Sequence, residues 1–177
     1  PRVVPEARVL PVVTYDEMLE MASSGAQVLN ARSVEYAKRF RVPLVVKSSF
    51  EEGPGTLIVE EEPGMEKVLV RGITYAKDEA KVTVLGVPDR PGIAAELFRT
   101  LADSDLNIDM IVQDVSESGV TNITFTVPQG DLARTMEAAR SAASRLGAED
   151  VAADENVGKV SIVGVGMRTH SGVAAAM

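Results

Sequence analysis

The sequence contains no cysteine and a single histidine, His170, among its 177 residues. The lack of cysteine excludes disulfide bonds, thiol catalysis and thiolate metal sites, and one histidine cannot build a histidine cluster around a metal. A metal would therefore need oxygen ligands. No nucleophile motif surrounds His170, which we interpret as an exposed loop residue. We predict neither a catalytic nor a metal-binding residue in this chain.

Excess positive charge and long apolar runs are also missing. The net charge is −8, whereas proteins that hold phosphate backbones carry clustered Lys and Arg, so no nucleic-acid partner is expected. No run approaches the roughly 18 apolar residues of a membrane span, and we expect a cytoplasmic protein without a membrane partner. Walker and GxGxxG phosphate loops are absent. The acidic runs Glu60–Glu62 and Asp78–Glu79 read as solvated charges.

A duplicated pattern is the main feature that is present. Residues 81–98 read KVTVLGVPDRPGIAAELF, and residues 159–177 repeat the pattern as KVSIVGVGMRTHSGVAAAM. Each copy predicts a strand that passes through a turn directly into a helix, which indicates two related small domains. The second copy ends within its predicted helix, so we expect a piece of a larger protein.

The residues before the first copy predict the end of an α/β domain. Thr14 and Glu17 form a capping-box pattern at the start of a helix, and residues 31–40 predict a second helix. The short apolar run Leu44–Val46 predicts a buried strand, and Thr56–Val59 another strand.

The first copy opens a β-α-β-β-α-β order, which is the ferredoxin-like arrangement with both helices on one face of a four-stranded sheet. A separate strand is predicted before it at Val68–Tyr75. The elements expected in that order are a strand at 81–85, a helix at 93–101, strands at 107–115 and 121–127, a helix at 132–146, and a strand at 151–153.

The turn before the first helix of this domain is a candidate ligand site. A helix N-terminus offers unpaired N–H groups to an amino-acid carboxylate, and Asp89, Asn107 and Asp109 could accept hydrogen bonds from its ammonium group. The simpler alternative is that Asp89 caps the helix and the turn binds nothing. Gln113 is expected to share a strand face with Asp109, where it faces either a ligand or water. The spacing alone favours the simpler alternatives.

Several blocks carry a resemblance to a known family. They include VPLVVKSSFEEGPGTLI, EAKVTVLGVPDRPGIAAELF, NIDMIVQDVS, NITFTV and KVSIVGVGMRTHSGVAAAM. In this order they resemble the latter part of bacterial aspartate kinases, over essentially the whole chain. The resemblance implies an enzyme that transfers the γ-phosphate of ATP, with Mg²⁺, to the side-chain carboxylate of aspartate. It also implies feedback control by lysine, threonine or both. It further implies a homodimer formed through ACT domains, which are small regulatory domains, either alone or together with catalytic subunits.

The resemblance also implies a domain division and a set of effector-binding residues. The domains are the end of an amino-acid-kinase catalytic domain at 1–48, a linker at 49–66, a strand of the second ACT domain at 67–79, the first ACT domain at 80–155, and the start of the second at 156–177. The implied effector-binding residues are Asp89, Gly92, Ile93, Ala94, Asn107, Ile108, Asp109 and Gln113, with Met167, Thr169 and Ser171 from the second domain.

The chain departs from the family pattern at the nucleotide site. Arg2 matches an arginine that contacts phosphates, but Gln27 replaces a nucleotide-contacting lysine and Asn30 replaces a histidine. A neutral amide cannot offer a positive charge to a phosphate. The family's catalytic residues have no counterpart in this sequence, so the chain by itself is expected to be inactive and to hold neither ATP nor Mg²⁺.

Two rival interpretations remain. The chain could be a structural dimerisation module that binds no ligand. An RNA-binding ferredoxin-like sheet is disfavoured, because the chain is acidic and its central strands offer no stacking aromatic apart from Phe125.

Overall fold

The structure is a computed structural model that describes residues 4–61, 70–115 and 119–164. The chain divides into two compact units, which are described separately. Unit 1 contains Pro1–Tyr75 and Val160–Met177, and unit 2 contains Ala76–Lys159. Among the described residues, no helix has the length and apolar character needed to cross a membrane.

Both helices predicted for unit 1 are confirmed. Helix α1 spans Tyr15–Ser23, and its capping box is complete: the Glu17 amide donates to Thr14 Oγ1 over 3.2 Å, and the Thr14 amide donates to Glu17 Oε2 over 2.9 Å. Helix α2 spans Ala31–Phe40, and its first turn is capped by the side chain of Asn30. Each cap satisfies an amide that has no partner within its helix.

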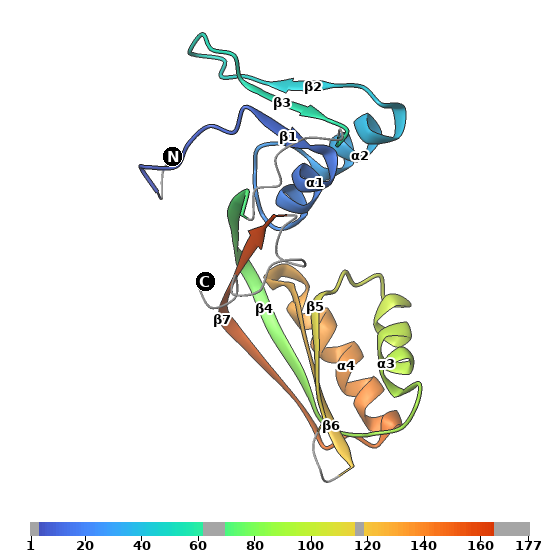
Figure 1. Cartoon of the computed structure of the whole chain (residues 1–177). Helices are drawn as coiled ribbons and strands as arrows, with labels where there is room; N and C mark the ends of the chain where they lie inside the picture. The colour runs from blue at the N-terminus through green and yellow to red at the C-terminus, as the bar shows by residue number, and fades with distance from the viewer. Residues whose placement is uncertain (1–3, 62–69, 116–118, 165–177) are drawn as a thin grey trace. The chain divides into compact units, whose positions relative to one another are not determined.

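Unit 1 also holds a three-stranded sheet (Figure 1). Strand β3 (Thr56–Val59) lies in the centre, parallel to β1 (Val12–Thr14) and antiparallel to β2 (Leu44–Val46). The prediction that β2 is buried is wrong. It is an edge strand, and Val45 is 54% exposed. The buried core of this unit consists of Val13, Tyr15, Met18, Met21, Val34, Ala37, Ile58 and Val163.

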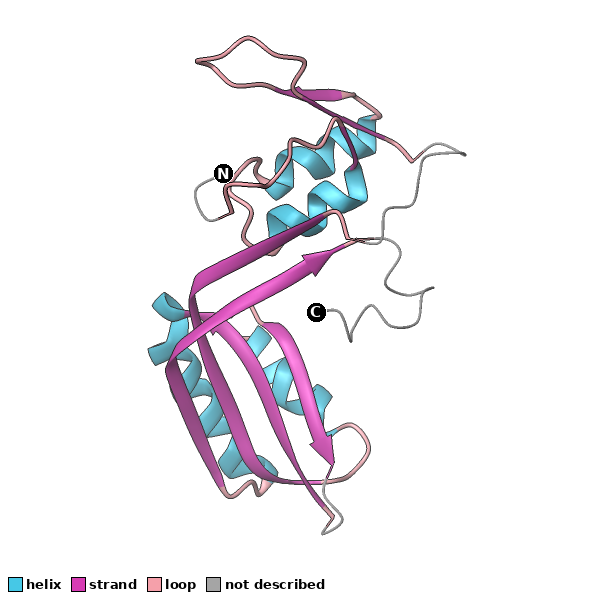
Figure 2. Cartoon of the chain, turned by 60° about the vertical axis from the view of Figure 1, so that its left-hand side comes forward, coloured by secondary structure: helices cyan, strands magenta, loops and turns pink. Residues whose placement is uncertain are grey.

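Unit 2 has the predicted β-α-β-β-α-β arrangement. Its sheet has the strand order β5-β6-β4-β7, and Figure 2 shows both helices on one face of that sheet. The elements are β4 (Gly72–Pro88), α3 (Ile93–Ala102), β5 (Asp109–Val115), β6 (Val120–Pro128), the short 3₁₀ helix η1 (Gln129–Asp131), α4 (Leu132–Leu146) and β7 (Asp150–Val163).

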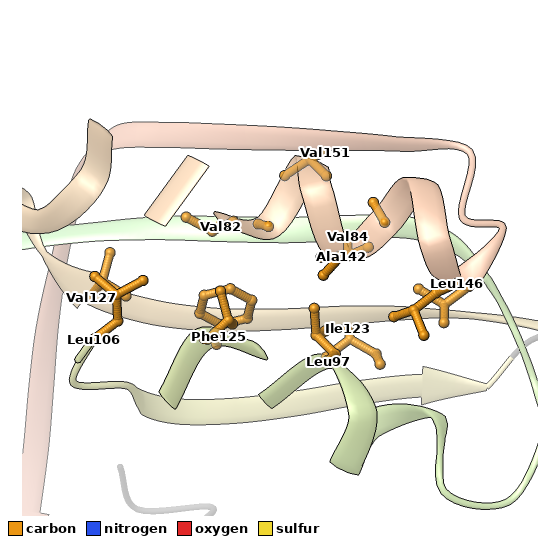
Figure 3. Packing of buried hydrophobic residues seen from close by; sticks show 14 of the residues in the cluster. Val82, Val84, Leu97, Leu106, Ile123, Phe125, Val127, Ala142, Leu146 and Val151 are labelled. Carbon is orange, nitrogen blue, oxygen red and sulfur yellow. The ribbon is translucent and has the colours of Figure 1, made fainter. Parts of the chain in front are cut away.

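The core of unit 2 follows the alternation of β6. Ile123, Phe125 and Val127 are fully buried against the helices, whereas the residues between them face away from the core (Figure 3). Phe125 packs edge-on against Phe98, with ring centroids 5.7 Å apart. Each such buried side chain contributes roughly 1.5–3 kcal/mol. The Phe125 ring lies in the core and is therefore not on the open face of the sheet, where an RNA-binding sheet would need a stacking aromatic.

Two strands are longer than the sequence predicts. The strand expected at 68–75 and the one at 81–85 are parts of one strand, β4, as far as the described residues show. Similarly, β7 joins the strand expected at 151–153 to the start of the second sequence repeat. Residues 76–80 contain neither glycine nor proline, and β4 continues through the acidic pair Asp78–Glu79. The domain boundaries stay a prediction.

Candidate functional site

The turn between β4 and α3 has the expected helix start, but Asp89 does not cap it. The N-cap residue is Gly92, in the left-handed region at φ 87°, and it makes no side-chain cap. The amide of Ile93 donates to the Arg90 carbonyl over 3.2 Å, and the amide of Asp89 donates to Gly119 over 3.0 Å. The prediction that Asp89 caps the helix is therefore wrong, since the backbone itself makes this turn.

The first turn of α3 can hold an anion. Because the Ile93 amide is occupied, the next amides available are those of half-buried Ala94 and exposed Ala95. Amides at this position have no partner within their own helix, and the helix dipole places partial positive charge there. The nearest acidic side chain of the helix, Glu96, is paired with Arg90 at 3.1 Å. A ligand carboxylate could dock at these two amides.

The other predicted residues lie where the chain enters β5. Asn107 is exposed, and Ile108 is half-buried against the core of unit 2. The side chain of Asp109 is 58% exposed, and its Oδ1 accepts the Met110 amide at 2.8 Å. Met110 has φ 44°, an uncommon value for a residue other than glycine.

A register shift at Met110 moves Gln113 to the other face. The pairing of β5 with β6 is irregular between Asp109 and Val112, as it is at a β-bulge. Asp109 lies opposite Thr126 on the open face, whereas Gln113 lies opposite buried Ile123 on the helix face. Directly paired residues share a face. The prediction that Asp109 and Gln113 share a face is therefore wrong.

The structure does not bring the turn and Asp109 together within unit 2. Pro88, at the end of β4, pairs with Val120 at the start of β6. Asp109 pairs with Thr126, six residues further along the same strand. At about 3.3 Å per residue, these points are roughly 20 Å apart. A single zwitterion site built from Asp89 and Asp109 of one domain is therefore excluded.

Asp109 has a partner that sequence reasoning missed. The ammonium of Lys159, on β7, makes a hydrogen-bonded ion pair with Asp109 Oδ2 and a second ion pair with Glu79 Oε1 at 3.2 Å. The side chains of Lys159 and Glu79 are only 7% and 13% exposed. We call these three residues the Lys159 cluster. The interpretation of Glu79 as a solvated charge is wrong.

The pairing changes the pKa values of two members of the cluster. The hydrogen bond from Lys159 is the main cause that lowers the pKa of Asp109, and the Met110 amide adds to it. For Lys159, burial alone would lower the pKa, but the hydrogen bonds to Asp109 and Glu79 outweigh burial and raise it above 10.5. The Lys159–Asp109 pair is therefore charged throughout the neutral range.

The duplicated pattern points to Lys159 but does not distinguish it from Lys81. Lys159 matches Lys81 in the duplicated pattern. Lys81 is 47% exposed and lies 4.0 Å from Asp154, an ordinary surface arrangement. The pattern of a strand does not say which of two matched lysines lies between carboxylates.

Of the two residues predicted to contact the nucleotide, the structure describes Gln27, which lies in unit 1. Gln27 is exposed and lines a pocket of about 250 Å³. Arg2, the effector residues Met167, Thr169 and Ser171, and His170 lie outside the described residues. Among the described residues, no three acidic or histidine side chains are grouped to hold a metal. The pocket is lined by Gly25, Ala26, Gln27, Ile73, Thr74 and Tyr75.

Comparison with known proteins gives consistent matches. Residues 81–144 match the family model of the ACT domain. An aspartokinase from Pseudomonas aeruginosa is 49% identical over 179 residues, which covers 100% of this chain and 43% of that protein. The chain thus spans less than half the length of this relative.

Solved structures agree with these matches. The ligand-free regulatory subunit of aspartate kinase from Thermus thermophilus is 34% identical, with a TM-score of 0.56 over 61% of this chain and 71% of that one. Escherichia coli aspartokinase III is 25% identical. Its complex with aspartate and ADP has a TM-score of 0.79 over 98% of this chain and 39% of that one. Its complex with lysine and aspartate has a TM-score of 0.68 over 93% and 36%.

Proposed function

Because this chain belongs to the aspartate kinase family, we propose that it is the regulatory part of a cytoplasmic enzyme that phosphorylates the side-chain carboxylate of aspartate with ATP. The observation that carries this proposal is the 49% identity to an aspartokinase over the whole length of the chain. In this proposal, residues 1–48 end the catalytic domain, 49–66 link it onward, 80–155 form the first ACT domain, and 67–79 and 156–177 belong to the second.

The regulatory ligand of this proposal is lysine, threonine or both. A free amino acid carries a carboxylate and an ammonium group, which match the open amides of α3 and the carboxylate of Asp109. These two features lie at opposite ends of β6. A pair of ACT domains placed side by side with opposite strand directions would bring one domain's turn to the other domain's Asp109. The effector would then bind between domains of a homodimer or of one chain.

The residues assigned to the effector fall into two groups in this arrangement. Asp89, Gly92, Ile93 and Ala94 lie at the end that would bind the ligand's carboxylate, through the amide of Ala94. Gln113 pairs with Ile123, midway between the two ends of β6. Asn107, Ile108 and Asp109 supply the ammonium end. Met167, Thr169 and Ser171 would come from the second ACT domain.

Phosphoryl transfer is proposed for the whole enzyme, because the chain spans only 43% of its aspartokinase relative. In the whole enzyme, ATP would supply the phosphoryl group and Mg²⁺ would neutralise its charge. Gln27 is exposed and neutral, so it could contact a nucleotide by hydrogen bonds only. Arg2 and Gln27 are the nucleotide contacts proposed for this chain.

Thermal unfolding of the full-length protein tests the regulatory proposal. We expect L-lysine or L-threonine to raise the melting temperature, because a ligand at a hundred times its Kd stabilises the folded state by about 2.7 kcal/mol. Asp109→Ala should abolish the rise. The absence of a shift with both amino acids would contradict the proposal.

A dimerisation module without a ligand is the second candidate. Its supporting observation is that Met110, Ile111 and Val112 on the edge strand β5 are each more than half exposed. An edge of this kind can pair with another copy without any small molecule. Dimers that form equally well with and without amino acids, together with a flat calorimetric titration, would favour this candidate.

A further inference from the structure

The Lys159 cluster places a lysine ammonium of the chain itself at the carboxylate proposed for the effector. We propose that Lys159 is an internal competitor of the effector: the ligand's ammonium replaces Lys159 at Asp109, and Lys159 stays paired with Glu79 alone. This inference rests on the proposed function and adds a mechanism by which the bound ligand changes the protein.

Both carboxylate oxygens of Asp109 already accept a hydrogen bond from the chain. Its Oδ1 accepts the Met110 amide at 2.8 Å, and its Oδ2 accepts the Lys159 ammonium. A second ammonium at this carboxylate would lie within a few ångströms of the first. Lys159 is 7% exposed, so water screens this repulsion poorly. The two cations therefore compete for this carboxylate.

Glu79 makes the exchange possible. If Lys159 had Asp109 alone, its displacement would leave a buried charge without a partner, which is strongly unfavourable. Glu79 Oε1 lies 3.2 Å from the same ammonium and is itself 13% exposed. Lys159 therefore remains paired in both arrangements, and a ligand that binds only one of them shifts the balance between the two.

The exchange acts on strands that continue into unit 1. Glu79 lies on β4 and Lys159 on β7, and both strands contribute residues to each unit. Within unit 1, the residue just before β4 is joined to β7, because the Arg71 amide donates to the Val163 carbonyl over 2.7 Å. Without ligand, Lys159 ties β7 to the start of β5. When the ligand is bound, the ion pair between Lys159 and Asp109 is broken.

The test is calorimetric titration of the full-length protein with L-lysine and L-threonine. We expect Lys159→Met to bind the effector about tenfold more tightly, because the arrangement that blocks the site is removed. Glu79→Gln should have the opposite effect and bind the effector several-fold more weakly. Without the Glu79 carboxylate, Lys159 has no ion-pair partner to turn to when it leaves Asp109.

Two substitutions on the same face of the sheet are matched controls for charge. Lys81→Met removes a lysine and Asp154→Asn removes a carboxylate, and these two residues pair only at 4.0 Å near the surface. Each control should change the effector Kd by less than about twofold. Circular dichroism establishes that each variant is folded. If Lys159→Met does not fold, the effector Kd of Glu79→Gln is compared with that of Asp154→Asn, and this comparison tests the competition.

The outcomes separate this inference from the proposed function. Opposite shifts for Lys159→Met and Glu79→Gln support the competition. If the wild-type protein binds an amino acid but Lys159→Met binds it equally or more weakly, Lys159 does not compete with the effector. The proposal of an effector site at Asp109 is then unaffected. The competition is also wrong if Glu79→Gln behaves like Asp154→Asn. If the wild-type protein binds neither amino acid, both proposals fail.

Discussion

At the scale of single residues, burial decides what a charge does. Lys81 and Lys159 occupy matching positions of the repeat, and each begins an alternating apolar run. Lys81 is 47% exposed and has a distant partner, so its contribution to stability is small. Lys159 is 7% exposed and held by two carboxylates. The same side chain is thus a surface charge in one copy and a buried structural cation in the other.

Asp109 gives the stability of the protein a dependence on pH. Lys159 lowers the pKa of Asp109 below its ordinary 3.8, so the stabilisation is present above that value and is lost as the pH falls through the folded-state pKa. Urea unfolding should therefore show a wild-type advantage over Asp109→Asn at about pH 7 that shrinks towards about pH 3. Asp89→Asn, at the exposed turn, is the control for the loss of one carboxylate. A difference that is constant with pH would contradict the assignment.

Thr74 offers a substitution that should stabilise the protein. Its hydroxyl is buried, and no described residue hydrogen-bonds to it. A buried polar group without a partner costs about 1–3 kcal/mol, so Thr74→Val should raise the free energy of unfolding by about 1 kcal/mol.

Thr135→Val is the matched control for Thr74. Thr135 is also buried, but its hydroxyl donates to the Asp131 carbonyl over 2.8 Å. This substitution should destabilise the protein by about 1 kcal/mol, as measured by urea unfolding. Equal effects of the two substitutions would mean that the Thr74 hydroxyl has a partner after all.

At the scale of elements, irregular pairing determines which side chains meet. The extra residue in β5 near Met110 puts Asp109 and Gln113 on opposite faces, although simple alternation places them together. A bulge adds one residue to one strand of a pair, so it reverses every face assignment beyond it. The hydrophobic run Met110–Val112 shows no sign of this, because all three side chains are apolar and exposed.

Strand β4 has a corresponding irregularity at Gly86, between Val84 and Val87. Both valines are fully buried, although they are three residues apart and simple alternation would put them on opposite faces. The extra residue between them therefore interrupts the alternation of the two faces. Gly86 has φ 61°, and a Cβ atom there would lie 2.3 Å from Glu149 Cγ. Gly86→Ala should therefore lower the free energy of unfolding by about 1–2 kcal/mol, from backbone strain and the displaced Glu149 side chain.

Gly130→Ala serves as the control for Gly86. Nothing lies within 4 Å of the Cβ position at Gly130, and its φ is not in the left-handed region. Its effect on stability should be within about 0.5 kcal/mol. Denaturant unfolding of both variants measures the difference, and equal stabilities would argue against a required glycine at Gly86.

At the scale of the whole molecule, the proposed effector site depends on two domains. The amides of α3 and the carboxylate of Asp109 belong to opposite ends of the same sheet. One domain can therefore offer either half of the site to a given ligand, but not both. Ligand binding and the pairing of ACT domains should then be linked thermodynamically.

This linkage predicts that the effector strengthens association between ACT domains. If the paired domains belong to different chains, a saturating effector should shift the monomer–dimer equilibrium of the full-length protein towards dimer in sedimentation experiments. Asp109→Ala should dimerise to the same extent with and without ligand. If the wild-type protein binds the effector but its association does not change, the site lies within one chain.

The sequence by itself determined the elements that depend on local pattern. The capping box at Thr14, the helix at 31–40 and the alternation of β6 were all readable, because each involves neighbours within a few residues. The resemblance to aspartate kinases was readable for the same reason, since it consists of contiguous blocks.

Only the tertiary structure decided what surrounds Asp109. Lys159 is 50 residues away along the chain, and its approach depends on the order β5-β6-β4-β7 and on the bulge near Met110. Contacts of this range are set by how strands pair across a sheet, which no local pattern encodes. The separation of the two halves of the proposed site has the same cause.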